Sequence, residues 1–161
     1  AKGITNATVP MGAVFVRDGI YDAFMSAAPE NAIEFFHGYT YSGHPLACAA
    51  GIATLDVYRS DDLFARAAEL APYFESALHS LGDANNVIDV RNLGMMGAIE
   101  LESIPRKPTF RAMDAFQKAF DAGLLIRTTG DTIALSPPLI IEKKQVDFIA
   151  DTVRAVLKTV H

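Results

Sequence analysis

The sequence predicts an α/β segment over residues 1–59, followed by a compact α+β domain over residues 60–161. The first segment contains an apolar run at 11–16, which is typical of a buried strand, and helical patterns follow it. The second segment begins with apolar residues at helical spacing. After Gly82, short apolar runs typical of strands alternate with helical patterns. This order favours a sheet of mixed strands packed with three helices.

In the first segment we expect a strand at 11–16 and then a helix that Asp18 caps and Pro29 stops. A longer helix is predicted from Pro45 to about residue 58, because proline suits the first turn of a helix. This helix is rich in alanine and glycine, whose small side chains let another backbone approach closely. We therefore expect it to be buried at a helix or subunit contact.

In the second segment Ser60 is expected to cap a helix that runs to Gly82, with Pro72 kinking it or splitting it in two. The remaining pattern predicts, in order, strands at 87–91 and 96–101 joined by a turn at 92–94, a helix over 109–122 closed by Gly123, short strands at 124–127 and 132–135, and a last helix over 143–160.

Composition and charge exclude several classes of function. Half of the 161 residues are hydrophobic and the formal net charge is −5, without a basic stripe, so no nucleic-acid partner is expected. The longest apolar runs, such as 47–55, are too short to span a bilayer, so no membrane partner is expected either. The single cysteine, Cys48, excludes an internal disulfide and fits a cytoplasmic protein in which it is a small buried apolar residue.

Lys2 and Thr40 are candidate site residues, and each also has an alternative role that involves no ligand. A lysine beside a chain terminus is usually a solvated charge, and composition alone gives Lys2 no other role. Thr40 lies in a hydroxyl-rich turn that leads into the predicted helix at Pro45. Free amides and the helix dipole favour a phosphate at such a place. The alternative is that Thr40 or Ser42 caps the helix.

Arg127 is the third candidate, at the end of a short apolar strand. Its planar guanidinium suits a carboxylate, and the alternative is a surface ion pair with Asp131. His37 and His44 lie across a turn without cysteines or paired carboxylates nearby, so we interpret them as structural and assign no metal.

Two stretches of the chain resemble class III (omega-type) aminotransferases. They are AKGITNATVPMGAV at 1–14 and HGYTYSGHP at 37–45. The amino-acid sequence at 34–45 and 86–92 is most similar to that of the beta-alanine (omega-amino acid):pyruvate aminotransferases. The resemblance implies the type I fold of enzymes that use pyridoxal 5'-phosphate (PLP): the end of its large domain, then its C-terminal small domain. It also implies a C-terminal fragment that starts at the PLP lysine.

The resemblance implies a role for each candidate. Lys2 would form the internal aldimine with PLP and afterwards carry the proton between substrate and cofactor, for which its amine must be neutral. Thr40 would bind the PLP phosphate of the neighbouring subunit, which implies a homodimer or a higher homo-oligomer. Arg127 would bind the substrate carboxylate and swing away when the substrate has none.

The implied reaction is ping-pong transfer of an amino group from an omega-amino acid or an amine to pyruvate. Two alternatives remain: another class III member acting on taurine, GABA or a diamine, and a non-enzymatic α+β interaction domain. We expect the fragment alone to be inactive and to expose apolar surface along 11–16 and 46–57.

Overall fold

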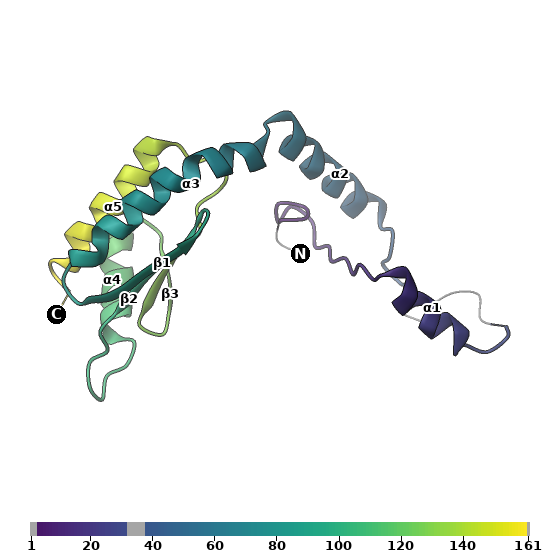
Figure 1. Cartoon of the computed structure of the whole chain (residues 1–161), viewed down its shortest axis with the longest axis horizontal. Helices are drawn as coiled ribbons and strands as arrows, with labels where there is room; N and C mark the ends of the chain where they lie inside the picture. The colour runs from purple at the N-terminus through teal and green to yellow at the C-terminus, as the bar shows by residue number, and fades with distance from the viewer. Residues whose placement is uncertain (1–2, 32–37, 161) are drawn as a thin grey trace. The chain divides into compact units, whose positions relative to one another are not determined.

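The computed structural model describes residues 3–31 and 38–160, and the chain divides into two compact units, Ala1–Asp61 and Asp62–His161 (Figure 1). Each unit has its own secondary structure. Within the described ranges, no helix is long and apolar enough to cross a membrane.

The first unit contains two helices, α1 (Asp18–Ser26) and α2 (Pro45–Ser60). The expected strand at 11–16 is wrong: this stretch is extended but unpaired, and Val14 and Phe15 are 89% and 93% exposed. A strand needs a neighbour to satisfy its backbone groups, and the described part of this unit offers none. Asp18 is not the cap of α1 but its first residue, where its charge favours the positive end of the helix.

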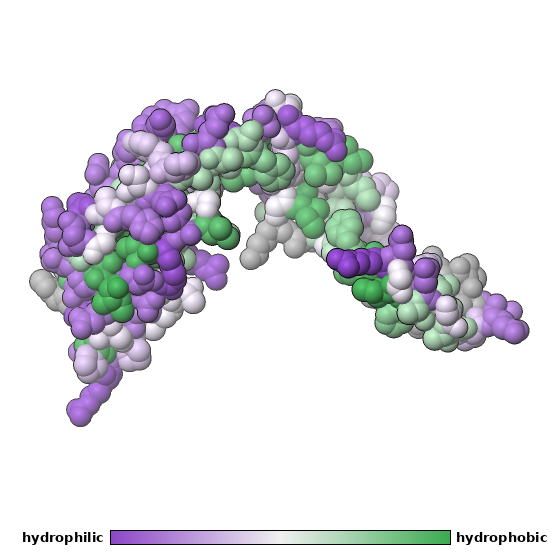
Figure 2. Space-filling view, in the orientation of Figure 1, coloured by the Kyte–Doolittle hydropathy of each residue, from purple (hydrophilic) through white to green (hydrophobic). Residues whose placement is uncertain are grey.

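The small residues of α2 lie on two sides of the helix. Ala47 and Gly51 are buried, as expected for a close backbone approach, whereas Ala49 and Ala53 are exposed. The large apolar side chains of α2 point away from the buried side, and they form part of the apolar surface over α2 in Figure 2. They are Leu46, Ile52, Leu55 and Val57, each at least half exposed. The expected apolar exposure along 11–16 and 46–57 is thus confirmed.

The second unit is a four-stranded antiparallel sheet covered by helices. The strands lie in the order β1-β2-β4-β3, with bounds Val87–Leu93, Met96–Leu101, Thr132–Leu135 and Arg127–Thr129. The helices are α3 (Leu63–His79), α4 (Phe110–Asp121) and α5 (Lys143–Leu157), and a short 3₁₀ turn, η1 (Ser80–Asp83), follows α3. Both hairpins turn through a glycine in the left-handed region, Gly94 at φ 55° and Gly130 at φ 60°.

The core of this unit lies between one face of the sheet and the three helices. Alternate residues of β2 and β4 point toward the helices, and the residues between them point to the open face. The buried side chains include Ile99, Leu101 and Ile133 from the sheet, Phe74 and Leu78 from α3, and Val146 and Val153 from α5. Three alanines of α4, at 112, 115 and 119, let that helix lie close to the sheet.

Several expected element ends are wrong for local reasons. Helix α2 continues through Ser60, so the residue before α3 is Asp62, in the left-handed region, and Ser60 is no cap. Helix α3 is continuous through Pro72 and is not split. Strand β3 begins at Arg127 rather than 124, and its pairing with β4 covers only Arg127–Thr129. The Leu124 amide instead donates to the Ala119 carbonyl of α4 at 2.8 Å.

Gly97 of β2 offers a direct test of this packing. A methyl group there would overlap the Leu78 side chain and lie 3.3 Å from the Phe74 ring, both of them buried. We expect Gly97→Ala to lower the free energy of unfolding by about 1–3 kcal/mol, measured by urea denaturation of the chain. Gly82→Ala is the matched control, since nothing lies within 4 Å of a methyl group there. Equal stability of the two variants would contradict the packing described.

Candidate active site

The turn before α2 is built by backbone hydrogen bonds. The Ser42 amide donates to the Tyr39 carbonyl at 3.0 Å, and the His44 amide donates to the Tyr41 carbonyl at 3.3 Å. Gly43 has φ 68°, a conformation that side chains rarely adopt. This turn places Thr40 and Ser42 on the surface just ahead of the first turn of α2.

His44, not Thr40 or Ser42, caps α2. Its Nδ1 accepts a hydrogen bond from the Ala47 amide at 3.4 Å, and Pro45 follows at the first helical position. The expectation of a structural His44 is confirmed, and capping by Thr40 or Ser42 is wrong. Within residues 3–31 and 38–160, no hydrogen bond involves the Thr40 side chain, so its hydroxyl is available to a ligand.

A cavity of about 650 Å³ lies between this turn and the segment that follows Lys2. Its walls are residues 9–12 on one side and, on the other, the turn and the first part of α2, including Thr40, Ser42 and Cys48. Cys48 is half-buried and free. Lys2 and His37 lie outside the described residues. Among the described residues, the cavity brings residues 9–12 together with the Thr40 turn.

Thr5 is a residue that sequence reasoning missed. It is 1% exposed, and its hydroxyl donates to the Val9 carbonyl at 2.5 Å, closing the loop that follows Lys2. Two residues inside this loop, Asn6 and Ala7, have positive φ values of 48° and 60°. A lone threonine among small and polar residues carries no periodic signal, so only the run of turn-forming residues at 3–8 hints at the loop.

Arg127 lies on the open face of the sheet in the second unit. It pairs with Ala134, which pairs with Ala98, which pairs with Arg91, so one row across the four strands carries two arginines separated by two alanines. Directly paired residues project to the same face. Along this row, only the methyl groups of Ala98 and Ala134 therefore lie between Arg91 and Arg127.

The two arginines differ in their partners. Arg91 donates to Asp89 at 2.5 Å and to Glu100 at 2.7 Å, and these carboxylates raise its pKa. Arg127 is exposed, and none of the described residues forms an ion pair or hydrogen bond with it. The alternative of an ion pair with Asp131 is wrong: the Oδ1 atom of Asp131 is buried and has no partner among the described residues.

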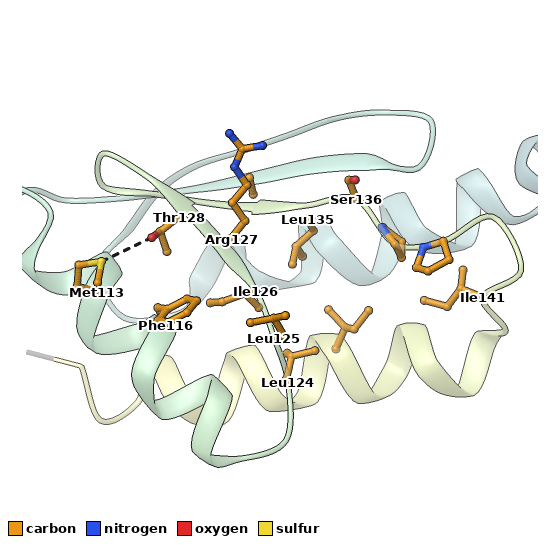
Figure 3. A pocket seen from close by; sticks show the side chains of 14 residues that line it. Met113, Phe116, Leu124, Leu125, Ile126, Arg127, Thr128, Leu135, Ser136 and Ile141 are labelled. Carbon is orange, nitrogen blue, oxygen red and sulfur yellow. Dashed lines mark hydrogen bonds between the residues drawn. The ribbon is translucent and has the colours of Figure 1, made fainter. Parts of the chain in front are cut away.

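A second cavity, of about 710 Å³, lies beneath β3 (Figure 3). Its lining is largely apolar, with Phe116, Leu124 and Ile126 pointing inward, and the Thr128 hydroxyl lies 3.8 Å from the Met113 sulfur. Only the stem of Arg127 borders this cavity, because its guanidinium points away from it in Figure 3. The guanidinium of Arg127 therefore lies on the open face of the sheet and not in this cavity.

The candidate residues are distributed over both units: Thr40 belongs to the first and Arg127 to the second. Among the residues with described positions, no group of three or more histidine, cysteine or acidic side chains could hold a metal ion.

The cap assignment can be tested by substitution. We expect His44→Ala to weaken the first turn of α2 by about 1 kcal/mol, seen as faster amide hydrogen exchange at residues 46–48. His44→Asn supplies another capping oxygen and should restore the exchange rates. Thr40→Val should leave them unchanged, and protection lost in Thr40→Val would show that the hydroxyl caps the helix after all.

Comparison with known proteins identifies the family. The family model "Aminotransferase class-III" matches residues 1–157. The omega-aminotransferase of Caulobacter vibrioides is 62% identical over 157 residues, covering 98% of this chain and 36% of the relative. The beta-alanine--pyruvate aminotransferase of Pseudomonas aeruginosa is 48% identical over 154 residues, covering 95% of this chain and 34% of the relative.

Solved structures agree with the sequence relatives. A transaminase with L-alanine superposes with a TM-score of 0.89 at 27% identity, covering 98% of this chain and 38% of that one. An amine transaminase from an uncultivated Pseudomonas species, in its PLP-bound form, gives 0.85 at 34% identity, covering 99% and 37%. The chain spans about a third of the length of the curated relatives it matches. The expected transaminase fold is confirmed, and the chain belongs to the class III aminotransferase family.

Proposed function

We propose that the protein carrying this sequence is a PLP-dependent omega-aminotransferase that transfers an amino group from an omega-amino acid or an amine to pyruvate. The observation that carries the proposal is the family match over residues 1–157 together with 62% identity to an omega-aminotransferase. Identity to a beta-alanine--pyruvate aminotransferase, at 48%, supports a beta-alanine-like donor and pyruvate as acceptor.

The proposal extends to the architecture of the whole protein. The first unit is the end of the large PLP-binding domain, and the second is the small C-terminal domain. The protein is a homodimer or a higher oligomer in the cytoplasm. The exposed apolar side chains at 14–16 and along α2 support this assembly, because apolar patches of this kind usually mark interfaces.

The residues present fit the cofactor. The Thr40 hydroxyl has no partner within the described ranges, and it stands beside a cavity of about 650 Å³ at the N-terminus of α2. A hydroxyl donor and the positive end of a helix suit the phosphate of PLP. In the proposed dimer, Thr40 holds the phosphate of the cofactor in the neighbouring subunit.

Lys2 and Arg127 complete the proposed site. Bound PLP supplies an electron sink for the bond broken at the amino-bearing carbon of the substrate. Lys2 holds the cofactor through its side-chain nitrogen and, once released, moves a proton with the same nitrogen, which must be neutral to accept it. Arg127 binds the substrate carboxylate, and its freedom from internal ion pairs leaves its donors available for that contact.

The role of Lys2 is tested by absorption spectroscopy of the full-length protein. We expect Lys2→Ala to lose the yellow absorption band of the lysine-bound cofactor and its turnover with beta-alanine and pyruvate. Lys158→Ala, at an exposed lysine after α5, is the control and should keep both. A band unchanged in Lys2→Ala would remove Lys2 from the mechanism.

The role of Arg127 is tested by two classes of donor. We expect Arg127→Met to raise KM for beta-alanine by about tenfold to a hundredfold, since a charged hydrogen bond to the carboxylate is lost. In single-turnover experiments, amino transfer from propylamine, which has no carboxylate, should proceed at the unaltered rate. Arg106→Met, at an exposed loop arginine, is the matched control. Equal losses with both donors would exclude carboxylate binding as the role of Arg127.

A diamine donor is the second candidate. A putrescine--pyruvate aminotransferase of Pseudomonas aeruginosa is 35% identical over 165 residues, so the same site residues are compatible with a diamine. A panel of beta-alanine, GABA, taurine and putrescine, compared by kcat/KM, separates these donors, because specificity is a difference in transition-state binding.

A further inference from the structure

We propose that Thr5 and Gly51 are positioning residues for Lys2, which hold the loop after the lysine in a single conformation on helix α2. The proposal rests on the proposed role of Lys2 as the cofactor-bearing residue. It assigns a task to two residues that the chemistry itself does not use.

The first part of this arrangement is the threonine hydroxyl. Thr5 is 1% exposed and donates to the Val9 carbonyl at 2.5 Å, while the Thr8 amide donates to the Thr5 carbonyl at 3.0 Å. Thr5 thus closes this short loop with two hydrogen bonds, one from its side-chain hydroxyl and one to its backbone carbonyl. Because the hydroxyl is excluded from water, no solvent molecule can substitute for it without opening the loop.

The loop is held in an unfavourable backbone conformation. Asn6 and Ala7 are consecutive residues at φ 48° and 60°, a region in which the Cβ of an L-residue lies too close to its own backbone. Such conformations persist only where the surroundings impose them, and they concentrate at functional sites. The Thr5 hydrogen bonds supply part of that constraint.

The second part is the small-residue side of α2. A methyl group on Gly51 would lie 3.4 Å from the Met11 sulfur and 3.8 Å from the Ile4 carbonyl oxygen. One on Gly3, the residue directly after Lys2, would lie 3.6 Å from the Tyr58 hydroxyl. The segment that follows Lys2 therefore lies against α2 near Gly51 and near Tyr58. A larger side chain at position 51 would push this segment away.

This arrangement bears on reaction rate rather than on substrate affinity. A lysine that must reach the cofactor and then a substrate carbon gains rate from being held in place, and a misplacement of about 1 Å can cost about a hundredfold. The carboxylate contact proposed for Arg127 is made by a residue of the other unit, whereas Thr5 and Gly51 hold the loop after Lys2. A loosened loop should therefore lower kcat and leave KM for pyruvate unchanged.

The test compares three threonine variants in the full-length protein. Thr5→Val removes the hydroxyl at nearly constant volume, and Thr5→Ser keeps it. Thr54→Val is the matched control, because the Thr54 hydroxyl likewise donates to a carbonyl four residues away, that of Ala50 at 2.8 Å, but within α2 itself. The readouts are amide hydrogen exchange at residues 3–9 in cofactor-free protein, and kcat and KM for pyruvate.

We expect Thr5→Val to speed exchange at residues 3–9 by about fivefold to tenfold, the effect of losing one net hydrogen bond, and to lower kcat at constant KM. Thr5→Ser should restore both quantities, and Thr54→Val should change neither. Unaltered exchange and kcat in Thr5→Val would overturn the proposal. So would a loss that Thr5→Ser does not repair.

Position 51 gives a second series should Thr5→Val fail to fold. Gly51→Ala makes only ordinary contacts and should keep kcat, whereas Gly51→Leu should lower it at constant KM. Equal kcat in both would overturn the proposal. Failure of the underlying function is recognised separately: there Lys2→Ala keeps the yellow band, whereas failure of the positioning role leaves Lys2→Ala without a band and Thr5→Val unaffected.

Discussion

The close approach of a loop to a helix backbone determines the geometry of the first unit. Helix α2 accepts the segment after Lys2 at Gly51, where a methyl group would make only ordinary contacts with Ile4 and Met11 and a larger side chain would push the segment away. The same helix begins at the turn that carries Thr40, so one rigid element supports both the lysine segment and the hydroxyl turn. The large apolar residues of α2 are thereby left on its outer side, where a further subunit or domain can cover them.

The second unit is built differently, as a sheet with helices on one face and charged side chains on the other. Helices cover one face of its sheet, and the opposite face is left open in this unit. Arg127 stands on that face in the edge strand β3, whose backbone is fixed by pairing with β4 on one side only. The backbone of this residue is thus anchored, while its long side chain retains its freedom of movement.

Much of this could be predicted from the sequence, and the failures share a cause. Alternating residues and the turn at Gly94 predicted the β1–β2 hairpin, because such signals are local. The strand expected at 11–16 failed because pairing depends on residues far away in the chain. The start of β3 failed because the Leu124 amide is bonded to the end of α4 instead of to β4, which no pattern within the strand indicates. Thr5 could not be found, since its burial follows from how its loop packs and not from any periodic pattern.

The carboxylates around Arg91 have a consequence for the row of residues that it shares with Arg127. Asp89 and Glu100 pair with the guanidinium of Arg91, whereas none of the described residues pairs with Arg127, so the two ends of the row differ in net charge. Loss of one of these carboxylates would leave Arg91 with the other, so this end of the row stays paired after a single substitution.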